Sequence, residues 1–389
     1  MGGEDGHHGG RDALLSGQAI EPLKVEGGQQ VVDLIEKIYA HSGFNARRLA
    51  DACRIYCRML EDRTTVALTM AGAMTPIGMS GPIIELIRNG FVDFIISTGA
   101  NIYHDLHRPF DLPMVQGHWA VDDNALAEEG VDRIYDVFIT EDESLDVTDE
   151  VFRNALMTIP ADTPISTAQL HHHLGRVFGQ VAPHPEKSFL VAAAEHDVPV
   201  YTSSPADSSV AIAAVVPYIH EHRILIDPMM DLMETTAIVW NAEKNGVVEL
   251  GGGSPKNFYL QTQPIIWMAF QKDLASGGHD YFIQLTTDAP HWGGLSGATP
   301  QEAKSWGKIK DAAVNNAVVY SCASITFPLL AGYVLSKQPP LPPKRLFGRR
   351  ESLVNQFIEE GRRSPRLREQ WDRAQAFLDK YPKLKDLWK

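Results

Sequence analysis

The feature that most constrains the fold is a unit that occurs at least four times along the chain. In each copy a short apolar run is followed by a polar or Gly-rich loop and then by a helical pattern. The apolar runs of this unit include Thr65–Leu68, Phe91–Ile96, Pro199–Tyr201 and Tyr281–Leu285. Buried strands that alternate with helices are typical of a doubly wound α/β fold. We therefore predict a mostly parallel sheet with helices on both faces.

The loops after these apolar runs are candidates for a nucleotide site, because folds of this type bind ligands at the carboxyl ends of their strands. Among them, Gly251–Gly253 would let the backbone approach a phosphate, and Ser254-Pro255 would begin a helix whose N-terminus favours anions. The GxGxxG spacing is absent, so a plain tight turn explains these glycines equally well. The loops in question are Met74–Gly81, Ser97–Asn101, Thr202–Ser209, Gly251–Pro255 and Thr286–Gly297.

A lysine with the setting needed for amine chemistry follows the last of these loops. Thr299 and Glu302 are typical of a helix N-terminus, and Gly307 can end that helix just before Lys308. Partial burial would lower the pKa of Lys308, and its neutral amine could then attack a carbonyl or imine carbon. The nearby indole of Trp306 could hold a cationic amine. A capping role for Glu302, a core role for Trp306 and a solvated Lys308 are the simpler alternatives.

Composition narrows the class of protein. The chain has 389 residues, a formal net charge of −14 and three cysteines, which argue against nucleic acid as a partner and against a disulfide framework. No apolar run approaches the ~20 residues that span a bilayer, and the first residues lack the apolar core of a signal peptide. We therefore expect a cytoplasmic protein without a membrane partner. Consecutive histidines, as in 171–173, cannot all reach one ion from a helix, so no metal site is predicted.

The composition also changes at both ends of the chain. Residues 1–24 are rich in Gly and His, and we expect this N-terminal segment to be mobile. Residues 25–336 carry the alternating pattern and form the predicted catalytic domain. Residues 337–389 begin with a stiff Pro-rich linker and continue as a basic, helical C-terminal extension. This extension is expected to dock onto the acidic body or onto a neighbouring subunit.

Several motifs together resemble the deoxyhypusine synthase family. Ser305–Ile309 reads SWGKI, and Ser296–Ala298 precedes it, while Phe327–Leu330 follows. A triple glycine, two further residues and Lys256 also match the family pattern. The resemblance extends from about residue 25 to residue 335. It implies the Rossmann-like, NAD-binding fold of that family, a homotetramer with active sites at subunit interfaces, and a covalent imine intermediate on Lys308.

The resemblance further implies roles for individual positions. Substrate contacts are expected from the Glu302 to Lys308 segment, which includes Trp306. The positions that match the family's NAD contacts are Thr98, Gly99, Asp207, Gly252, Thr287, Asp288 and Ala323. Further substrate-contact positions of the family hold Tyr103, His104, Asn257 and Leu295 in this chain.

At the substrate positions the chain departs from the family pattern. The family binds the cationic ends of a polyamine with acidic side chains, but Ile212, Leu295 and Trp292 occupy three of those places. Tyr103 and His104 replace paired glutamates, and Asn257 stands where the family has histidine. Because an unpaired buried ammonium is costly, recognition of spermidine should be weakened.

We therefore expect retained imine chemistry on an altered amine. The function that the resemblance implies is NAD-dependent transfer of an aminoalkyl (aminobutyl) group from a polyamine, through Lys308, to a small amine acceptor, as in homospermidine formation. Two alternatives stay open. One is deoxyhypusine synthase activity on a lysine of a translation initiation factor, and the other is a non-catalytic NAD-binding assembly protein.

Overall fold

A computed structural model describes residues 15–270, 277–311 and 314–387 of the chain. Residues 1–14 of the N-terminal segment, for which mobility was predicted, lie outside these ranges. Residues 15–24 are exposed and contain no helix or strand. The regular structure begins with a helical stretch from Val31 to His41, formed by α2 Val31–Asp33, η1 Leu34–Ile38 and η2 Tyr39–His41.

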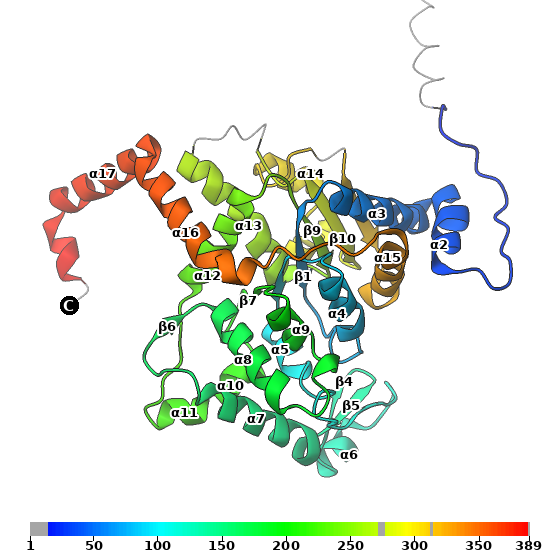
Figure 1. Ribbon diagram of the computed structural model, residues 1–389, viewed down its shortest axis with the longest axis horizontal. Coiled ribbons are helices and arrows are strands. Elements are labelled where there is room, and N and C mark those ends of the chain that lie inside the picture. Colours follow the sequence, from blue (N-terminus) through cyan, green and yellow to red (C-terminus); the bar gives the residue numbers. More distant parts are fainter. Residues whose placement is uncertain (1–14, 271–276, 312–313, 388–389) are drawn as a thin grey trace, which may run out of the picture.

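A six-stranded parallel sheet forms the centre of the molecule, in the order β11-β10-β9-β1-β2-β7. Every residue of β1, β9 and β10 is buried, because helices cover both faces of the sheet (Figure 1). The prediction of a doubly wound, mostly parallel α/β fold is confirmed. The strands are β1 Thr65–Met70, β2 Phe94–Ser97, β7 Val200–Thr202, β9 Asn245–Leu250, β10 Tyr281–Thr286 and β11 Asn316–Tyr320.

Two apolar layers follow from the alternation of side chains along the strands. Leu68, Val248 and Ile283 face a layer with α3 Phe44–Glu61, α4 Ser80–Arg88 and α15 Ala323–Lys337. Val247 and Phe282 face the opposite layer, where they pack with residues of α12 Pro228–Asn241, α13 Gly253–Phe270 and α16 Leu346–Arg363. The sheet is therefore held between two cores, and its strand ends are left to loops.

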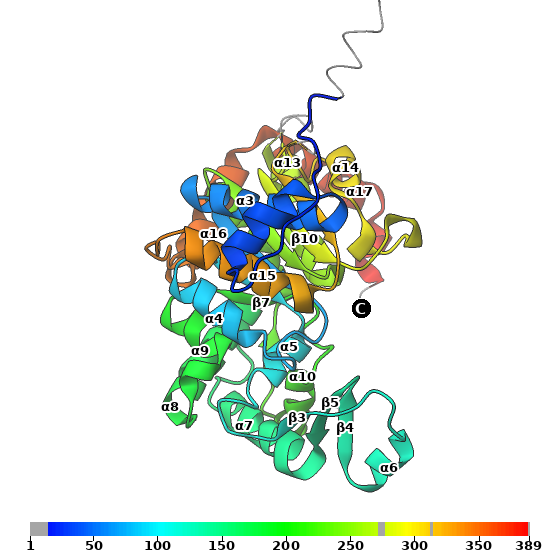
Figure 2. The same ribbon diagram turned by 90° about the vertical axis from the view of Figure 1, so that its right-hand side faces the viewer.

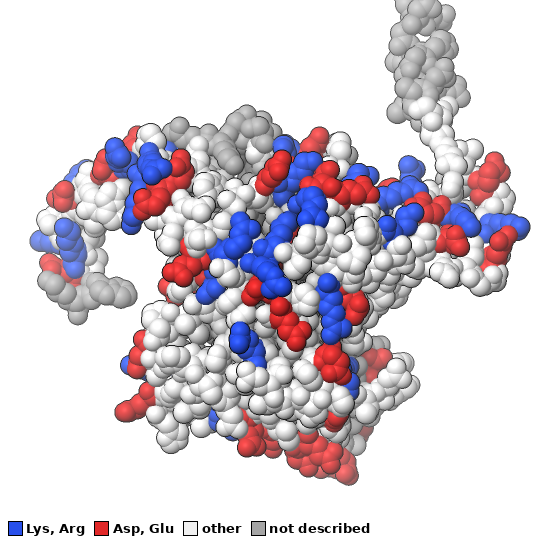
Figure 3. Space-filling model, viewed as in Figure 1, with Lys and Arg blue, Asp and Glu red and all other residues white. Residues whose placement is uncertain are grey.

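The part of the chain between β2 and β9 also forms a lobe at the lower end of the molecule (Figures 1 and 2). It includes a small antiparallel sheet in the order β3-β5-β4, which the sequence did not predict. Acidic side chains gather at this end, around α6 (Figure 3). The remaining elements here are α5 Gly99–His104, β3 Met114–Gln116, α6 Asp123–Glu128, β4 Val131–Ile134, β5 Val137–Thr140, η3 Glu141–Asp146, α7 Val147–Leu156, β6 Pro164–Ile165, α8 Thr167–Val181, η4 Pro185–Lys187, α9 Phe189–Glu195, α10 Ser209–Ala213, α11 Val215–Ile219 and β8 Leu225–Ile226.

The C-terminal extension is helical and docks by its first helix. Leu353 and Phe357 of α16 are buried against α12 and α13, and Lys344 Nζ lies 3.0 Å from the buried carboxylate of Asp93. The next helix, α17 Pro365–Lys380, has no buried residue and projects from the body together with η7 Pro382–Asp386 (Figure 1). Within the described ranges, no helix has both the length and the apolar character needed to cross a bilayer.

Candidate active site

Local sequence signals place Lys308 just beyond a short helix, α14 Pro300–Ser305. The helix begins as predicted, because Thr299 Oγ1 accepts a hydrogen bond from the backbone N–H of Glu302. It ends at Gly307, which adopts a left-handed φ of 68°. The N–H groups of Gly307 and Lys308 then donate to the carbonyls of Lys304 and Ala303, the pattern of a Schellman motif. The backbone of Lys308 is therefore fixed by the helix that precedes it.

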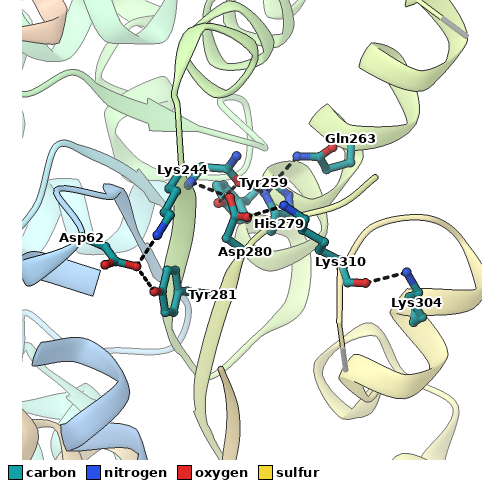
Figure 4. Close-up of polar contacts among 10 residues, drawn as sticks. Asp62, Lys244, Tyr259, Gln263, His279, Asp280, Tyr281, Lys304 and Lys310 are labelled. Carbon is teal, nitrogen blue, oxygen red and sulfur yellow. Dashed lines mark hydrogen bonds and ion pairs between the residues drawn. The ribbon is translucent and has the colours of Figure 1, made fainter. Parts of the chain in front are cut away.

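The residues next to Lys308 are also held by the chain that leads into β10. His279 N–H donates to the Lys308 carbonyl over 2.9 Å, and Lys310 N–H donates to the His279 carbonyl over 3.0 Å. Gly278 permits this approach, since a Cβ there would lie 2.4 Å from the Ile309 carbonyl carbon. His279 is fully buried, and its ring stacks on Tyr259 of α13 at 4.0 Å between centroids (Figure 4).

Two further lysines of this segment make polar contacts of their own. Lys310 Nζ lies 3.2 Å from Asp280 Oδ1, and Lys304 Nζ donates to the Lys310 carbonyl (Figure 4). Lys308 Nζ donates to the amide oxygen Oδ1 of Asn257 over 3.1 Å. A neutral acceptor of this kind does not require an ammonium ion as its donor.

The surroundings of Lys308 lower its pKa. The largest cause is partial burial, which disfavours the charged form, and the second is the nearby ammonium of Lys256. The carboxylate of Glu302 opposes both effects. Lys308 Nζ also lies 5.9 Å from the ring centroid of Trp306, whose side chain is 65% exposed. The amine is thus half-buried beside an indole and is biased toward the neutral form that attacks carbon.

The triple glycine opens the helix that carries Asn257, the hydrogen-bond partner of this amine, and it lies at the point where the strand order reverses. β1 and β9 are neighbours in the sheet, and the chain leaves β1 toward β2 but leaves β9 toward β10. Gly251–Gly253 follows β9 and opens α13, which carries Asn257 in its second turn. Such a switch point is where doubly wound sheets bind ligands. Lys308 is therefore bonded to the helix that starts at this switch point, while its backbone lies beside the chain that enters β10.

The shape of this turn fits a dinucleotide. Gly253 has a φ of 58° and open space where a side chain would lie, and its N–H is at the start of a long helix. Gly252 packs so closely on Ser296 that an added Cβ would lie 2.5 Å from the Ser296 Cα. Ser296 Oγ accepts a hydrogen bond from Gly253 N–H, which fixes the turn. The open space beside Gly253 at this helix N-terminus leaves room for a phosphate of NAD, whereas Gly252 is covered by Ser296 and the Gly253 N–H is already donated.

All residues predicted to contact NAD follow the carboxyl ends of the strands. A cavity of about 380 Å³ at the ends of β2 and β7 is bordered by Gly99, Thr202 and Ser208. Asp207 and Asp288 are exposed at the same edge of the sheet. The predicted positions are Thr98 and Gly99 after β2, Asp207 after β7, Gly252 after β9, Thr287 and Asp288 after β10, and Ala323 after β11.

The predicted substrate contacts fall into two groups. Asn257 and Leu295 line a groove of about 410 Å³ along α13, and the exposed Glu302 and Trp306 lie on α14 and at its end. Apart from Asn257, this groove is lined by Leu232, Ser254, Phe258, Gln261, Pro264, Ile265, Met268 and Leu295. No carboxylate belongs to this lining among the residues that the structure describes.

Tyr103 and His104 form the second group, on α5, which lies well below α14 in both ribbon views (Figures 1 and 2). Tyr103 is 2% exposed, and its hydroxyl donates to Asp149 over 2.6 Å. His104 Nδ1 lies 2.9 Å from His107 Nε2, and burial lowers the pKa of His104 to about 4. One chain alone does not bring these side chains to Lys308, so their role in substrate binding stays a prediction.

Three polar residues behind the site were missing from the predicted set. Glu249 and Lys256 are 0% and 2% exposed, and Lys256 Nζ donates to Gln284 Oε1 over 2.9 Å. Glu249 and Gln284 are partners in the register of β9 and β10. The available signal was a polar residue inside each of two apolar runs, VVEL and YFIQL. Such residues in buried strands need partners, and here Lys256 supplies one.

Comparison with known proteins assigns this chain to a family. The deoxyhypusine synthase family model matches residues 33–334, which is most of the chain. The chain belongs to the deoxyhypusine synthase family. A deoxyhypusine synthase-like protein of Nostoc sp. is 41% identical over 351 residues, which cover 88% of this chain and 90% of the relative. The family is enzymatic, and its members are transferases.

An archaeal relative and a crystal structure agree with this membership. "Probable deoxyhypusine synthase 2" of Methanosarcina acetivorans is 38% identical over 291 residues, covering 75% of this chain and 82% of the relative. The crystal structure of a proposed deoxyhypusine synthase from Entamoeba histolytica aligns with a TM-score of 0.53 at 16% identity. The alignment covers 81% of this chain and 96% of the crystallised chain, and it supports the assignment of the fold.

Proposed function

We propose that the protein is an NAD-dependent aminoalkyl transferase that carries its transferred group as an imine on Lys308. The main support for the proposal is the local environment of the Lys308 amine. It is half-buried, bonded to the neutral Asn257, and held beside the first turns of α13, which the triple glycine opens. Its lowered pKa favours the nucleophilic form. Membership in a transferase family supports this reading.

The residues of the site have separate roles in this reaction. When bound, NAD would accept a hydride from the amine-bearing carbon of the donor and later return it. The face of Trp306 would hold the cationic donor, and Glu302 would balance its charge. The Lys308 amine then attacks the imine carbon, a C–N bond forms to Nζ, and the rest of the donor leaves as a free amine. An acceptor amine displaces Lys308 in the same way, so the reduction that follows leaves no net change in oxidation state.

The groove along α13 favours a small amine acceptor. Its lining is apolar except for Ser254, Asn257 and Gln261, which can accept a hydrogen bond from one ammonium or amine. A multiply charged polyamine end would find no carboxylate there among the described residues, and burial of an unpaired charge is costly. We therefore propose an acceptor with at most one charge in the groove, which gives a homospermidine-type product. The homotetramer stays a prediction.

Product analysis across a panel of amines tests this proposal. The enzyme is incubated with NAD and pairs of donor and acceptor amines, and new secondary amines are identified by mass spectrometry. A translation initiation factor of the deoxyhypusine-accepting type is included as a protein acceptor. The proposal expects a small-molecule product from the wild type and none from Lys308→Arg, whose guanidinium stays charged. Lys244→Arg serves as the control, because Lys244 pairs with Asp62 and makes no contact with Asn257.

Three results would contradict the proposal. Modification of the protein acceptor alone would assign deoxyhypusine synthase activity instead. Equal product from Lys308→Arg and wild type would remove Lys308 from the chemistry. NAD binding with no product from any pair would favour a non-catalytic NAD-binding protein.

A further inference from the structure

The cavity of about 380 Å³ at the ends of β2 and β7 has an apolar body and a buried polar end. His171 of α8 and Thr202 of β7 border it, and each is only 3% exposed. The lining also includes the exposed Ala206 and Pro228, so the cavity opens to solvent on that side. No Asp, Glu, Lys or Arg lines it within the described part of the chain. Its apolar walls include Leu156, Leu170, Val210 and Ile226.

The polar end of the cavity offers a hydrogen-bond acceptor and a hydroxyl donor. His171 Nδ1 lies 2.8 Å from the Val200 carbonyl oxygen, which can only accept, so Nδ1 carries the proton. Burial lowers the pKa of His171 to about 4, and the ring is therefore neutral near pH 7 with a bare Nε2. Thr202 Oγ1 is 3.4 Å from Nε2, which is longer than a normal hydroxyl hydrogen bond. The two buried groups thus satisfy each other poorly.

The cavity adjoins the turn at which a phosphate of NAD was placed. Ser254, the residue after Gly253, donates from Oγ to Ser203 Oγ over 2.8 Å, and Ser203 directly follows β7. Asn257, which accepts the hydrogen bond of Lys308 Nζ, lies three residues after Ser254 on α13. A dinucleotide with a phosphate at Gly253 can therefore extend one of its two bases into the cavity. The proposed reaction requires the redox-active base close to Lys308, which favours nicotinamide over adenine.

We propose that this cavity holds the nicotinamide of NAD, with the carboxamide N–H donating to His171 Nε2 and the carboxamide oxygen accepting from the Thr202 hydroxyl. A planar primary carboxamide presents a donor and an acceptor side by side, which matches the two groups at the buried end. An ammonium group has no acceptor atom, and its charge finds no carboxylate in the described lining. The inference rests on the proposed function, because it takes NAD as the cofactor.

The test measures the binding of NAD and of two analogues that each change one group. In the 3-acetylpyridine analogue a methyl group replaces the carboxamide NH₂, and in the hypoxanthine analogue an oxygen replaces the amino group of adenine. Dissociation constants are measured by calorimetry on full-length wild type and on variants whose thermal midpoints show that they are folded.

Two variants each remove one of the proposed contacts. His171→Asn keeps an N–H for the Val200 carbonyl and removes Nε2, whereas Thr202→Val keeps the shape of the side chain and removes its hydroxyl. His173→Asn is the matched control, because His173 lies on the same helix but contacts Thr158 and does not line the cavity.

Wild type and His173→Asn should bind the 3-acetylpyridine analogue about tenfold more weakly than NAD, because the methyl group leaves the His171 acceptor unpaired. His171→Asn should bind NAD about tenfold more weakly than wild type does, and it should bind the two ligands about equally. Thr202→Val should weaken both ligands by about the same factor, because it loses a bond to the oxygen that they share.

Equal affinity of wild type for NAD and the 3-acetylpyridine analogue overturns the inference, as does an unchanged preference for NAD in His171→Asn. A preference of wild type for NAD over the hypoxanthine analogue that disappears in His171→Asn would place adenine in the cavity and also overturns it. In each of these cases NAD still binds, so the proposed function stands. No binding of NAD by wild type overturns both.

Discussion

The hydrogen bond between Lys308 and Asn257 gives a prediction with a definite sign. Asn257→Asp replaces the neutral acceptor by a carboxylate of nearly the same shape, 3.1 Å from Nζ. An opposite charge at this distance favours the ammonium form and raises the pKa of Lys308. Because only the neutral amine attacks carbon, activity is lost as the pH falls through the pKa of Lys308. The variant should therefore need a higher pH for the same rate.

The size of the effect follows from the distance and the exposure. Two unit charges about 4 Å apart interact by about 4 kcal/mol at an effective dielectric constant near 20. Lys308 is half-buried, so solvent screens most of this energy. After screening, we expect an interaction free energy of roughly 1.4 kcal/mol, which raises the pKa of Lys308 by about one unit. Below the midpoint the variant should be about tenfold slower than wild type, and above both midpoints the two rates should converge.

The assay is the initial rate of product formation between pH 6 and 11 with saturating amines and NAD. Gln261→Glu is the matched control, because it adds the same charge four residues, about 6 Å, farther along α13. Its midpoint should stay close to that of wild type. The reasoning is refuted if the midpoint of Asn257→Asp does not move, or if Gln261→Glu moves it by the same amount.

Two further predictions concern the cofactor turn and the C-terminal extension. Gly252→Ala places a Cβ 2.5 Å from the Ser296 Cα, so NAD should bind this variant at least tenfold more weakly by calorimetry. Gly348→Ala, which has open space around its Cβ, should bind NAD as wild type does. Equal affinities of the two variants would show that the turn is not part of the cofactor site. Truncation after Ser364 removes only α17 and η7, which contain no buried residue and touch the body through the partly buried Leu367, and it should leave the thermal midpoint within about 2 °C of wild type. Truncation before α16 also removes the buried Leu353 and Phe357, whose burial contributes about 1.5–3 kcal/mol of stability each, and it should lower the thermal midpoint clearly. A larger loss of thermal midpoint from the shorter truncation than from the longer one would contradict this packing.

Much of the fold could be predicted from sequence because its signals are local. The apolar runs at β1, β2, β7 and β10 are short and are bounded by polar loops, so their alternation with helices defines the fold class. Thr299 and Gly307 act on the backbone within a few residues, and they place the start and end of α14. The loops that carry the predicted NAD contacts follow the strands in sequence, so they must share one edge of a parallel sheet.

The features that could not be predicted from the sequence depend on which strands and helices are neighbours in the fold. Glu249 and Gln284 become partners only because β9 and β10 lie side by side, and Lys256 reaches both only because α13 crosses that face. Tyr103 packs inward toward Asp149 because α7 lies against α5, which no local pattern reports. The small β3-β5-β4 sheet was missed because its strands have only three or four residues and are partly exposed.

Capture of the covalent intermediate tests the central claim most directly. The enzyme is incubated with NAD and a donor amine, treated with borohydride and digested, and the masses of its lysine peptides are compared with those of untreated enzyme. We predict the added aminoalkyl mass on the peptide that contains Lys308, and none on Lys308→Arg protein. An addition at Lys304 or Lys310 instead, or no addition with any amine of the panel, would contradict the account.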